Sequence, residues 1–208
     1  MWSRRPRKAV LVLALDTTGP HCAAAVARDG HVLAHISERI GRGHAERLAP
    51  MVMEVLATAG AEAPSIDRLA VCTGPGSFTG LRVALSYAKG FALPRRLPIV
   101  GVDALGLTYM GSGTAPDFGT VWADIRRGDV MFGDYAGPGP MVHNHPRIGT
   151  PDERDAHAAL MQFELMEAGI PDVALLARIA GDLDPAHYPA VPLYARAPDA
   201  KLPGGVSL

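Results

Sequence analysis

The chain is poor in cysteine, in aromatic side chains and in net charge, and these shortages exclude several classes of protein. Among 208 residues there are two cysteines, Cys22 and Cys72, which are too few for a disulfide framework or a thiolate metal cage. Both lie in apolar stretches, so we expect small buried thiols. Lys and Arg number 20 against 21 Asp and Glu, and the net charge of −1 creates no overall field that attracts nucleic acid or an acidic membrane.

Long hydrophobic runs are also missing. No stretch approaches the roughly 18 consecutive apolar residues that cross a bilayer. Basic residues before an apolar run at 9–15 imitate a signal peptide, but the run stops at Asp16 without a small-residue cleavage site. We therefore expect a cytoplasmic protein with no membrane segment. A hydrophobic content of 48% favours a globular domain over a disordered chain.

The first part of the chain alternates strand-like and helix-like segments. Asp29 and Gly30 suit a two-residue hairpin turn between two of the strands. Hairpin-linked strands are antiparallel and helix-linked strands are parallel, so this order predicts an α/β fold with a mixed sheet. The predicted strands cover residues 9–15, 22–27, 31–37, 69–73 and 99–102, and the predicted helices cover residues 44–59, 78–91 and 104–110.

The second part of the chain is less regular. Residues 111–116 form the most linker-like stretch, which divides the chain into domains 1–110 and 111–208. Prolines after residue 184 allow only a short element near Tyr194, and this tail could pack back on the first domain. The other predicted elements are hairpin strands at 120–125 and 129–135, a loop-rich segment at 137–151, and helices at 152–168 and 172–180.

A short polar motif follows the first predicted strand. Asp16 could bind Mg²⁺, and turn amides near Thr17 could hold phosphate. The alternative is a turn whose side chains cap their own backbone. The motif alone does not decide between the two.

A glycine-rich loop, GPGSFTG at residues 74–80, connects a predicted strand with a helix. Gly74, Gly76 and Ser77 place backbone amides at a helix N-terminus, which favours an anion. Arg82 could pair with phosphate or with a carboxylate. The spacing matches neither a P-loop nor a dinucleotide fingerprint, so nucleotide contact and a rigid turn with a hydroxyl helix cap both stay open.

No residues can be assigned to catalysis or to a metal from spacing. His44 begins a predicted helix, but a helical metal pair needs a second ligand four residues on, and that position is Leu48. His143 and His145 alternate in a predicted loop without carboxylate or thiolate neighbours, which is typical of solvated side chains.

The two longer predicted helices have regular apolar faces that include small residues. Such a face usually packs on the protein's own sheet, but small residues also let a second helix approach closely. The pattern alone leaves both interpretations open. The residues that we predict for a partner surface are Leu48, Met51, Val52, Val55, Leu81, Ala84, Leu85 and Ala88.

Several segments, taken together in order and spacing, resemble the TsaB (YeaZ) family. They are LALDTT at 13–18, HAERLAP at 44–50, GPGSFTGLR at 74–82 and PIVGV at 98–102, with weaker matches in RRGDV at 126–130 and PLYAR at 192–196. The resemblance implies an actin-like fold of the sugar kinase and Hsp70 type, with two lobes that each contain a mixed sheet and helices. Residues 161–170 look helical where the family usually has a strand, so we expect a reduced C-terminal lobe.

The resemblance also implies a role in forming N6-threonylcarbamoyladenosine at position 37 of tRNA. In this family the protein is a non-catalytic partner of TsaD, docked through its first two helices, and TsaE joins the pair. TsaD has two metal-binding histidines where this chain has His44 and Leu48. We therefore expect no activity of the chain's own, a homodimer when TsaD is absent, tRNA contact through the complex, and room for ATP or ADP with Mg²⁺ at the complex interface.

Two other functions stay open. A phosphotransferase of the actin-like ATPase superfamily would bind nucleotide with Asp16 and the glycine loop. A metal-dependent glycoprotease-like hydrolase would need the pair of ligands that this chain lacks at His44 and Leu48.

Overall fold

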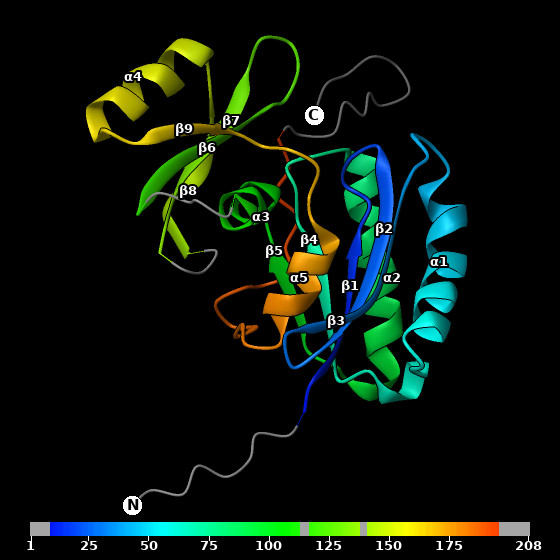
Figure 1. The fold of residues 1–208 in the computed structure, drawn as a ribbon. Helices are drawn as coiled ribbons and strands as arrows, with labels where there is room; N and C mark the ends of the chain where they lie inside the picture. Colours follow the sequence, from blue (N-terminus) through cyan, green and yellow to red (C-terminus); the bar gives the residue numbers. More distant parts are fainter. Residues whose placement is uncertain (1–8, 113–116, 138–140, 196–208) are drawn as a thin grey trace, which may run out of the picture.

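The computed structural model describes residues 9–112, 117–137 and 141–195, which form two lobes (Figure 1). The described residues contain one five-stranded and one four-stranded sheet. Each sheet combines parallel and antiparallel pairs, which confirms the predicted α/β class with a mixed sheet in each lobe.

The central strand of the sheet in the first lobe is fully buried and apolar up to its last residue, Asp16. All six residues of that strand are buried, because helices cover both of its faces. Asp29 and Gly30 form the predicted hairpin turn, with φ values of 49° and 77°. In spatial order the strands are β3 (His31–Arg39), β2 (His21–Arg28), β1 (Leu11–Asp16), β4 (Arg68–Cys72) and β5 (Ile99–Val102).

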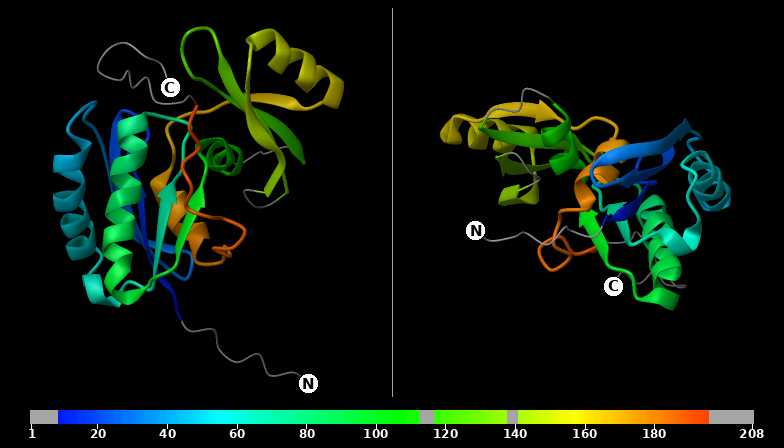
Figure 2. Two further views of the ribbon diagram at one scale, coloured as in Figure 1. Left: turned by 180° about the vertical axis from the view of Figure 1, so that it is seen from behind. Right: turned by 60° about the horizontal axis from the view of Figure 1, so that its bottom comes forward.

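Helices cover both faces of this sheet and make three layers (Figure 2). Leu13 and Leu15 of β1 pack with the first two helices, whereas Val12 and Ala14 point to the opposite face. The first two helices are α1 (His44–Thr58) and α2 (Phe78–Ala92), those on the opposite face are α3 (Ala104–Gly111) and α5 (Val173–Ala180), and two short 3-10 turns are η1 (Ala63–Ser65) and η2 (Leu93–Arg95).

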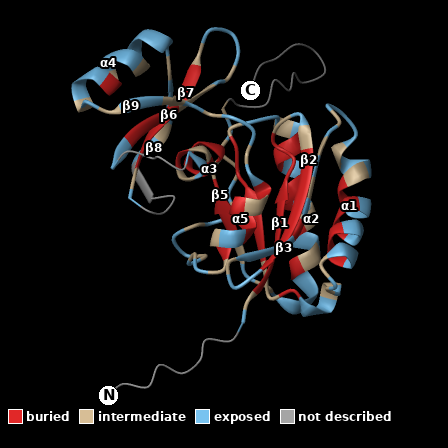
Figure 3. Cartoon of the chain, in the orientation of Figure 1, coloured by how far each residue is buried: buried red, intermediate tan, exposed pale blue. Residues whose placement is uncertain are grey.

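The second lobe is smaller and shares α3 with the first. One side of α3 packs on the first sheet through Leu107, and the other side places Leu105 and Tyr109 against Tyr135 of the second sheet. Figure 3 shows burial concentrated in the first lobe and a largely exposed helix on the second. The elements of this lobe are β8 (Met141–Gly149), β7 (Val130–Ala136), β6 (Phe118–Asp124), β9 (Glu164–Glu167) and α4 (Pro151–Met161).

A buried carboxylate joins the elements of the second lobe. Asp134 of β7 accepts hydrogen bonds from Thr120 of β6 at 2.7 Å and from Asn144 of β8 at 2.8 Å, and it lies 2.8 Å from Nε2 of His157 on α4. Burial alone would raise the pKa of Asp134, but these polar contacts outweigh it and hold the pKa below the usual 3.8. Asp134 is therefore an ionised and well-paired group inside the lobe.

Two strands of the second lobe correct the sequence interpretation. The segment expected to be loop-rich contains β8, which tolerates Pro146 because it lies at the edge of its sheet. The helix predicted over residues 152–168 ends at Met161, because Gln162 after it has a left-handed φ of 57°, and β9 follows. The expectation of a helix in place of this family strand is therefore wrong.

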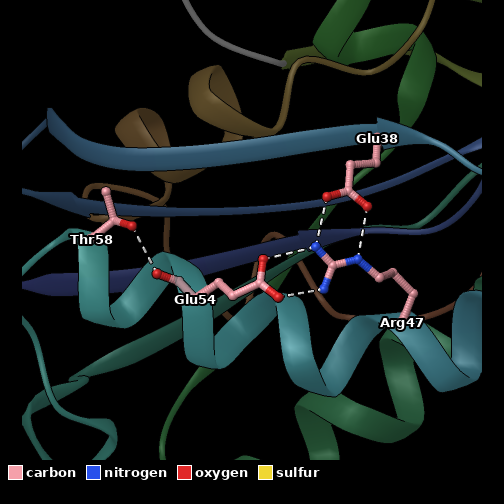
Figure 4. A network of polar contacts seen from close by, with 4 residues as sticks. All are labelled: Glu38, Arg47, Glu54 and Thr58. Atoms are coloured by element: carbon pink, nitrogen blue, oxygen red, sulfur yellow. Dashed lines mark hydrogen bonds and ion pairs between the residues drawn. The ribbon is translucent and has the colours of Figure 1, made fainter.

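An arginine connects α1 to the edge strand β3 (Figure 4). Arg47 donates to both carboxylate oxygens of Glu38, at 2.7 and 2.6 Å, and to both of Glu54, at 2.8 Å each. The hydrogen bonds from Arg47 hold the pKa values of both glutamates below their ordinary value. Arg47 thus fixes the start of α1 over the strand that has only one hydrogen-bonded neighbour in its sheet.

The chain beyond the predicted domain boundary returns to the first lobe. Residues 113–116 of that boundary, residues 1–8 and residues 196–208 lie outside the described residues. Helix α5 packs on β1 and β2 of the first sheet. No helix in the described ranges is both long and apolar enough for a membrane span.

Candidate functional site

The polar turn after β1 and the glycine-rich loop before α2 interlock. The Thr17 hydroxyl donates to the carbonyl of Gly80 at 2.6 Å and accepts from the amide of Ala84 at 3.2 Å. The amide of Ser77 donates to the carbonyl of Thr18 at 2.7 Å. The face of the loop that points to β1 is thus occupied by the protein's own backbone.

Two glycines permit this close approach. A Cβ atom on Gly80 would collide with the carbonyl oxygen of Thr17, and one on Gly76 would collide with that of Thr18. The Ser77 hydroxyl accepts from the amide of Gly80 at 3.3 Å and forms the N-cap of α2. The glycines therefore serve tight packing of two loops, and the hydroxyl serves as a helix cap.

Asp16 does not fit a Mg²⁺ ligand in this arrangement. Its side chain is 1% exposed, and its Oδ1 accepts from the amide and the hydroxyl of Thr18 at 2.9 and 2.7 Å. Burial raises the pKa of Asp16, and the bonds from Thr18 lower it by less. Its Oδ2 has no hydrogen-bond partner within the described residues but is buried, so a hydrated cation could not reach it unless the turn moved. Of the residues predicted for phosphate contact, Asp16 and Thr17 are buried in this turn, whereas Gly76, Ser77 and Arg82 are exposed on the other side of the loop.

His44 contacts the backbone. Its Nε2 lies 3.1 Å from the carbonyl oxygen of Gly19, and Leu48, one turn later, is 1% exposed. Within the described ranges, no group of three or more His, Cys, Asp or Glu side chains is placed to hold a metal.

The residues predicted for a partner surface are buried against the chain's own core, and of them Leu48 also borders the groove described below. The structure corrects this assignment, because the apolar stripe of each helix packs on the sheet and a regular period alone cannot separate a core face from a partner face. Each of these side chains is at most 5% exposed: Leu48, Met51, Val52, Val55, Leu81, Ala84, Leu85 and Ala88.

The outer side of the same two helices forms a groove of about 480 Å³, here called the α1–α2 groove. Val83 and Tyr87 of α2 are half-buried in it, and burial raises the pKa of the Tyr87 phenol. Small residues on both helices, such as Ala45 and Ser86, let another helix approach closely. The lining residues are Ala45, Leu48, Phe78, Thr79, Arg82, Val83, Ser86 and Tyr87.

A second cavity of about 550 Å³ lies where β5 faces the second lobe and the tail. Asp103, after β5, caps α3 by accepting from the amide of Gly106 at 2.8 Å, and it accepts from the Tyr135 hydroxyl at 2.6 Å. Burial raises the pKa of Asp103 above its usual value. His145 of the second lobe and Leu193 of the tail are also part of the wall.

Comparison with known proteins identifies the family. The sequence model "TsaD: tRNA N6-adenosine threonylcarbamoyltransferase" matches residues 32–137, just over half of the chain. The chain is 39% identical over 126 residues to the tRNA threonylcarbamoyladenosine biosynthesis protein TsaB of Escherichia coli (strain K12), which covers 60% of this chain and 54% of that protein. The chain belongs to the TsaB (YeaZ) family. It is also 35% identical over 210 residues to an uncharacterized protein of Mycobacterium tuberculosis, with 91% and 93% of the two chains covered.

Solved structures agree with this family. YeaZ from Pseudomonas aeruginosa superposes with a TM-score of 0.73 at 24% identity and covers 89% of this chain and 99% of that one. A second structure, described as an uncharacterized protein with similarity to peptidase YEAZ from the same organism, gives a TM-score of 0.74 at 25% identity, with 90% and 100% covered. These likenesses confirm the two-lobed α/β fold of the family. The matched region spans just over half of the E. coli TsaB protein, so its activity and partners reach this chain only as proposals.

Sequence reasoning on this TsaB-family chain predicted both helices but did not single out the outer side on which the groove lies. The available signal was the spacing of Thr79, Val83 and Ser86, which lie opposite the buried stripe of α2. A valine and a tyrosine that stay half-buried on the side of a helix away from its core face are typical of a second contact surface.

Proposed function

We propose that this chain is a non-catalytic partner of TsaD in the formation of N6-threonylcarbamoyladenosine in tRNA. The observation that supports it is the α1–α2 groove, an outward-facing cleft on the two helices of a TsaB-family chain. TsaD would place a helical pair in this groove and make a four-helix contact. The chain would contribute shape, while the transfer reaction takes place on TsaD.

The physical character of the groove suits a helical partner. Ala45 and Ser86 have short side chains, which leave room for a second helix, and Val83 and Tyr87 supply apolar area. Close approach of backbones allows many dispersion contacts, and a half-buried tyrosine can add a hydrogen bond at the edge. Helix pairs that meet in this way pack ridges of one surface into grooves of the other.

Further members of the assembly stay predictions. A homodimer of this chain would use the same groove when TsaD is absent, and TsaE and tRNA would join through the complex. ATP or ADP with Mg²⁺ at the complex interface would have to draw its ligands from residues other than the sealed Asp16. The interlocked loops at Thr17 and Gly80 count against the phosphotransferase alternative.

The test is reconstitution of the modification with TsaD, TsaE and threonylcarbamoyl-adenylate, with and without this chain. We expect the chain to be inert alone and required in the mixture. The variant Ala45→Arg should lose co-elution with TsaD and tRNA modification, because an unpaired charge buried in an apolar interface costs about 3–5 kcal/mol. Ala156→Arg, an exposed alanine on α4 of the second lobe, is the matched control and should behave as the wild type.

Two outcomes would contradict the proposal. If Ala45→Arg still co-elutes with TsaD and supports modification as Ala156→Arg does, the groove is not the docking surface. If the mixture modifies tRNA equally well without this chain, the proposed role is wrong.

A further inference from the structure

A segment after α5, residues 185–195, runs back along the first lobe and is here called the strap. The amide of Gly101 in β5 donates to the carbonyl of Tyr188 at 2.9 Å, and Val100 forms an antiparallel bridge with Pro189. Further on, the amide of Leu193 donates to the carbonyl of Thr73 at 2.8 Å. Backbone bonds at two points therefore fix the strap against the edge of the sheet.

The strap places a tyrosine against the first turn of α2. The ring of Tyr194 lies 5.0 Å from the ring of Phe78, and the guanidinium carbon of Arg82 lies 3.8 Å from the centre of the same phenylalanine ring. Nε of Arg82 donates to the Tyr194 hydroxyl at 3.4 Å. Phe78 and Arg82 both line the α1–α2 groove, so the strap braces one end of it.

Arg82 keeps hydrogen-bonding capacity in this position. The flat face of the guanidinium group stacks on the Phe78 ring, and its Nε donates to the Tyr194 hydroxyl. Within the described residues, its two Nη atoms donate to no acceptor. Helix α2 contains the cations Arg82 and Lys89 and no Asp or Glu. A stacked guanidinium presents its remaining N–H groups in a plane, which matches a carboxylate.

We propose that Arg82 recognises a carboxylate of the helical partner that docks in the α1–α2 groove, and that Tyr194 is its positioning residue. This inference rests on the proposed function and extends it to the chemistry of the contact. The occupant is a protein surface with an apolar helix face and an Asp or Glu at the end that meets α2. The half-buried Val83 and Tyr87 favour that occupant over an RNA backbone, because they would leave phosphates beside apolar area.

The experiment is a double-mutant cycle on binding to purified TsaD, with Kd measured by calorimetry. Arg82→Gln should weaken binding about tenfold to a hundredfold, since it removes a charge-assisted hydrogen bond pair. Arg82→Lys should not restore it, because an ammonium group cannot stack and bond in the same plane. Tyr194→Ala should weaken binding about threefold to tenfold through loss of the aromatic brace.

The coupling energy between Arg82 and Tyr194 distinguishes a positioning role of Tyr194 from a role in packing alone. In the Arg82→Gln background, Tyr194→Ala should have almost no further effect on Kd, because the group it positions is gone. Raising the salt concentration should weaken wild-type binding more steeply than binding of Arg82→Gln. Arg178→Gln, an exposed arginine on α5 at the opposite face of the sheet, is the matched control and should leave Kd unchanged.

Failure of this inference is distinct from failure of the proposed function. If the wild-type chain does not bind TsaD, both are wrong. If it binds and Arg82→Gln matches the Arg178→Gln control, the carboxylate contact is wrong and the partner role stands. If Arg82→Gln binds TsaD normally but the assembled complex loses affinity for tRNA, Arg82 contacts RNA phosphate and the inference is overturned.

Discussion

Gly80 shows how a single position can determine the local packing of two loops. A methyl group there would meet the backbone carbonyl of Thr17, which cannot rotate away as a side chain would. We expect Gly80→Ala to destabilise the protein by about 3 kcal/mol, because overpacking against backbone forces both loops to move. Urea denaturation followed by circular dichroism measures this change.

Gly90 provides a control on the same helix. It lies inside α2, and an added Cβ would meet nothing within 4 Å. Gly90→Ala should therefore stabilise the protein by up to about 1 kcal/mol, because alanine has the higher helix propensity. Equal changes in the free energy of unfolding for the two substitutions would show that the close contact between Gly80 and Thr17 does not affect stability.

Asp134 gives the second lobe a stability that depends on pH. Its pKa is lower in the folded state than the unfolded value of 3.8, so its contribution is present above pH 3.8 and is lost as the pH falls through the folded pKa. Asp134→Asn should cost about 2 kcal/mol at neutral pH, because Thr120, Asn144 and His157 lose an ionised acceptor. The difference from wild type should shrink in urea titrations at about pH 3, and a difference that grows there would contradict the account.

At the scale of elements, the contacts of Arg47 protect the edge strand β3. Glu38 and Glu54 have lowered pKa values, so this protection is present above their usual 4.5 and is lost as the pH falls through the lower folded values. Arg47→Lys loses the paired bonds, and we expect faster amide hydrogen exchange in β3 with little change in β1. Arg39→Lys, an exposed arginine on the same strand, is the control, and exchange equal to that of Arg47→Lys would refute the proposed link.

The elements also show where sequence patterns stop being informative. The interior strands and both long helices were predicted within a few residues, because a strand buried on both faces is a continuous apolar run and a helix buried on one face has a strong period. The edge strands β8 and β9 were missed, since an edge tolerates Pro146 and Glu164–Glu167 is rich in helix-forming residues. For the candidate site, the sequence located the helices but not the groove on their outer faces, because the strong period of the core stripe dominates the pattern.

At the scale of the whole molecule, α3 and the Tyr135–Asp103 hydrogen bond join the two lobes. Tyr135 donates to Asp103 at 2.6 Å from the second sheet to the cap of α3. Tyr135→Phe should lower the free energy of unfolding by about 1–2 kcal/mol, since a buried carboxyl group loses a donor.

Unfolding of the second lobe can be measured separately from unfolding of the whole protein. Trp122 lies in β6 of the second lobe, and in a background with Trp2→Phe its fluorescence reports that lobe alone. We expect the Trp122 transition of Tyr135→Phe to shift to lower urea than the transition seen by circular dichroism. Coincident transitions at the wild-type midpoint would show that the hydrogen bond does not couple the lobes.

The strap has a consequence for the order in which the molecule becomes complete. Every strand and helix that the structure describes precedes residue 185 in the chain, and the strap then packs Tyr188, Ala190 and Leu193 against their cores. A product cut at that point would keep its secondary structure yet expose the backbone of Gly101, an open strand edge of the kind that recruits other chains. The same few residues thus brace the proposed docking groove and cover an open strand edge, so we expect truncation to weaken partner binding and to promote aggregation together.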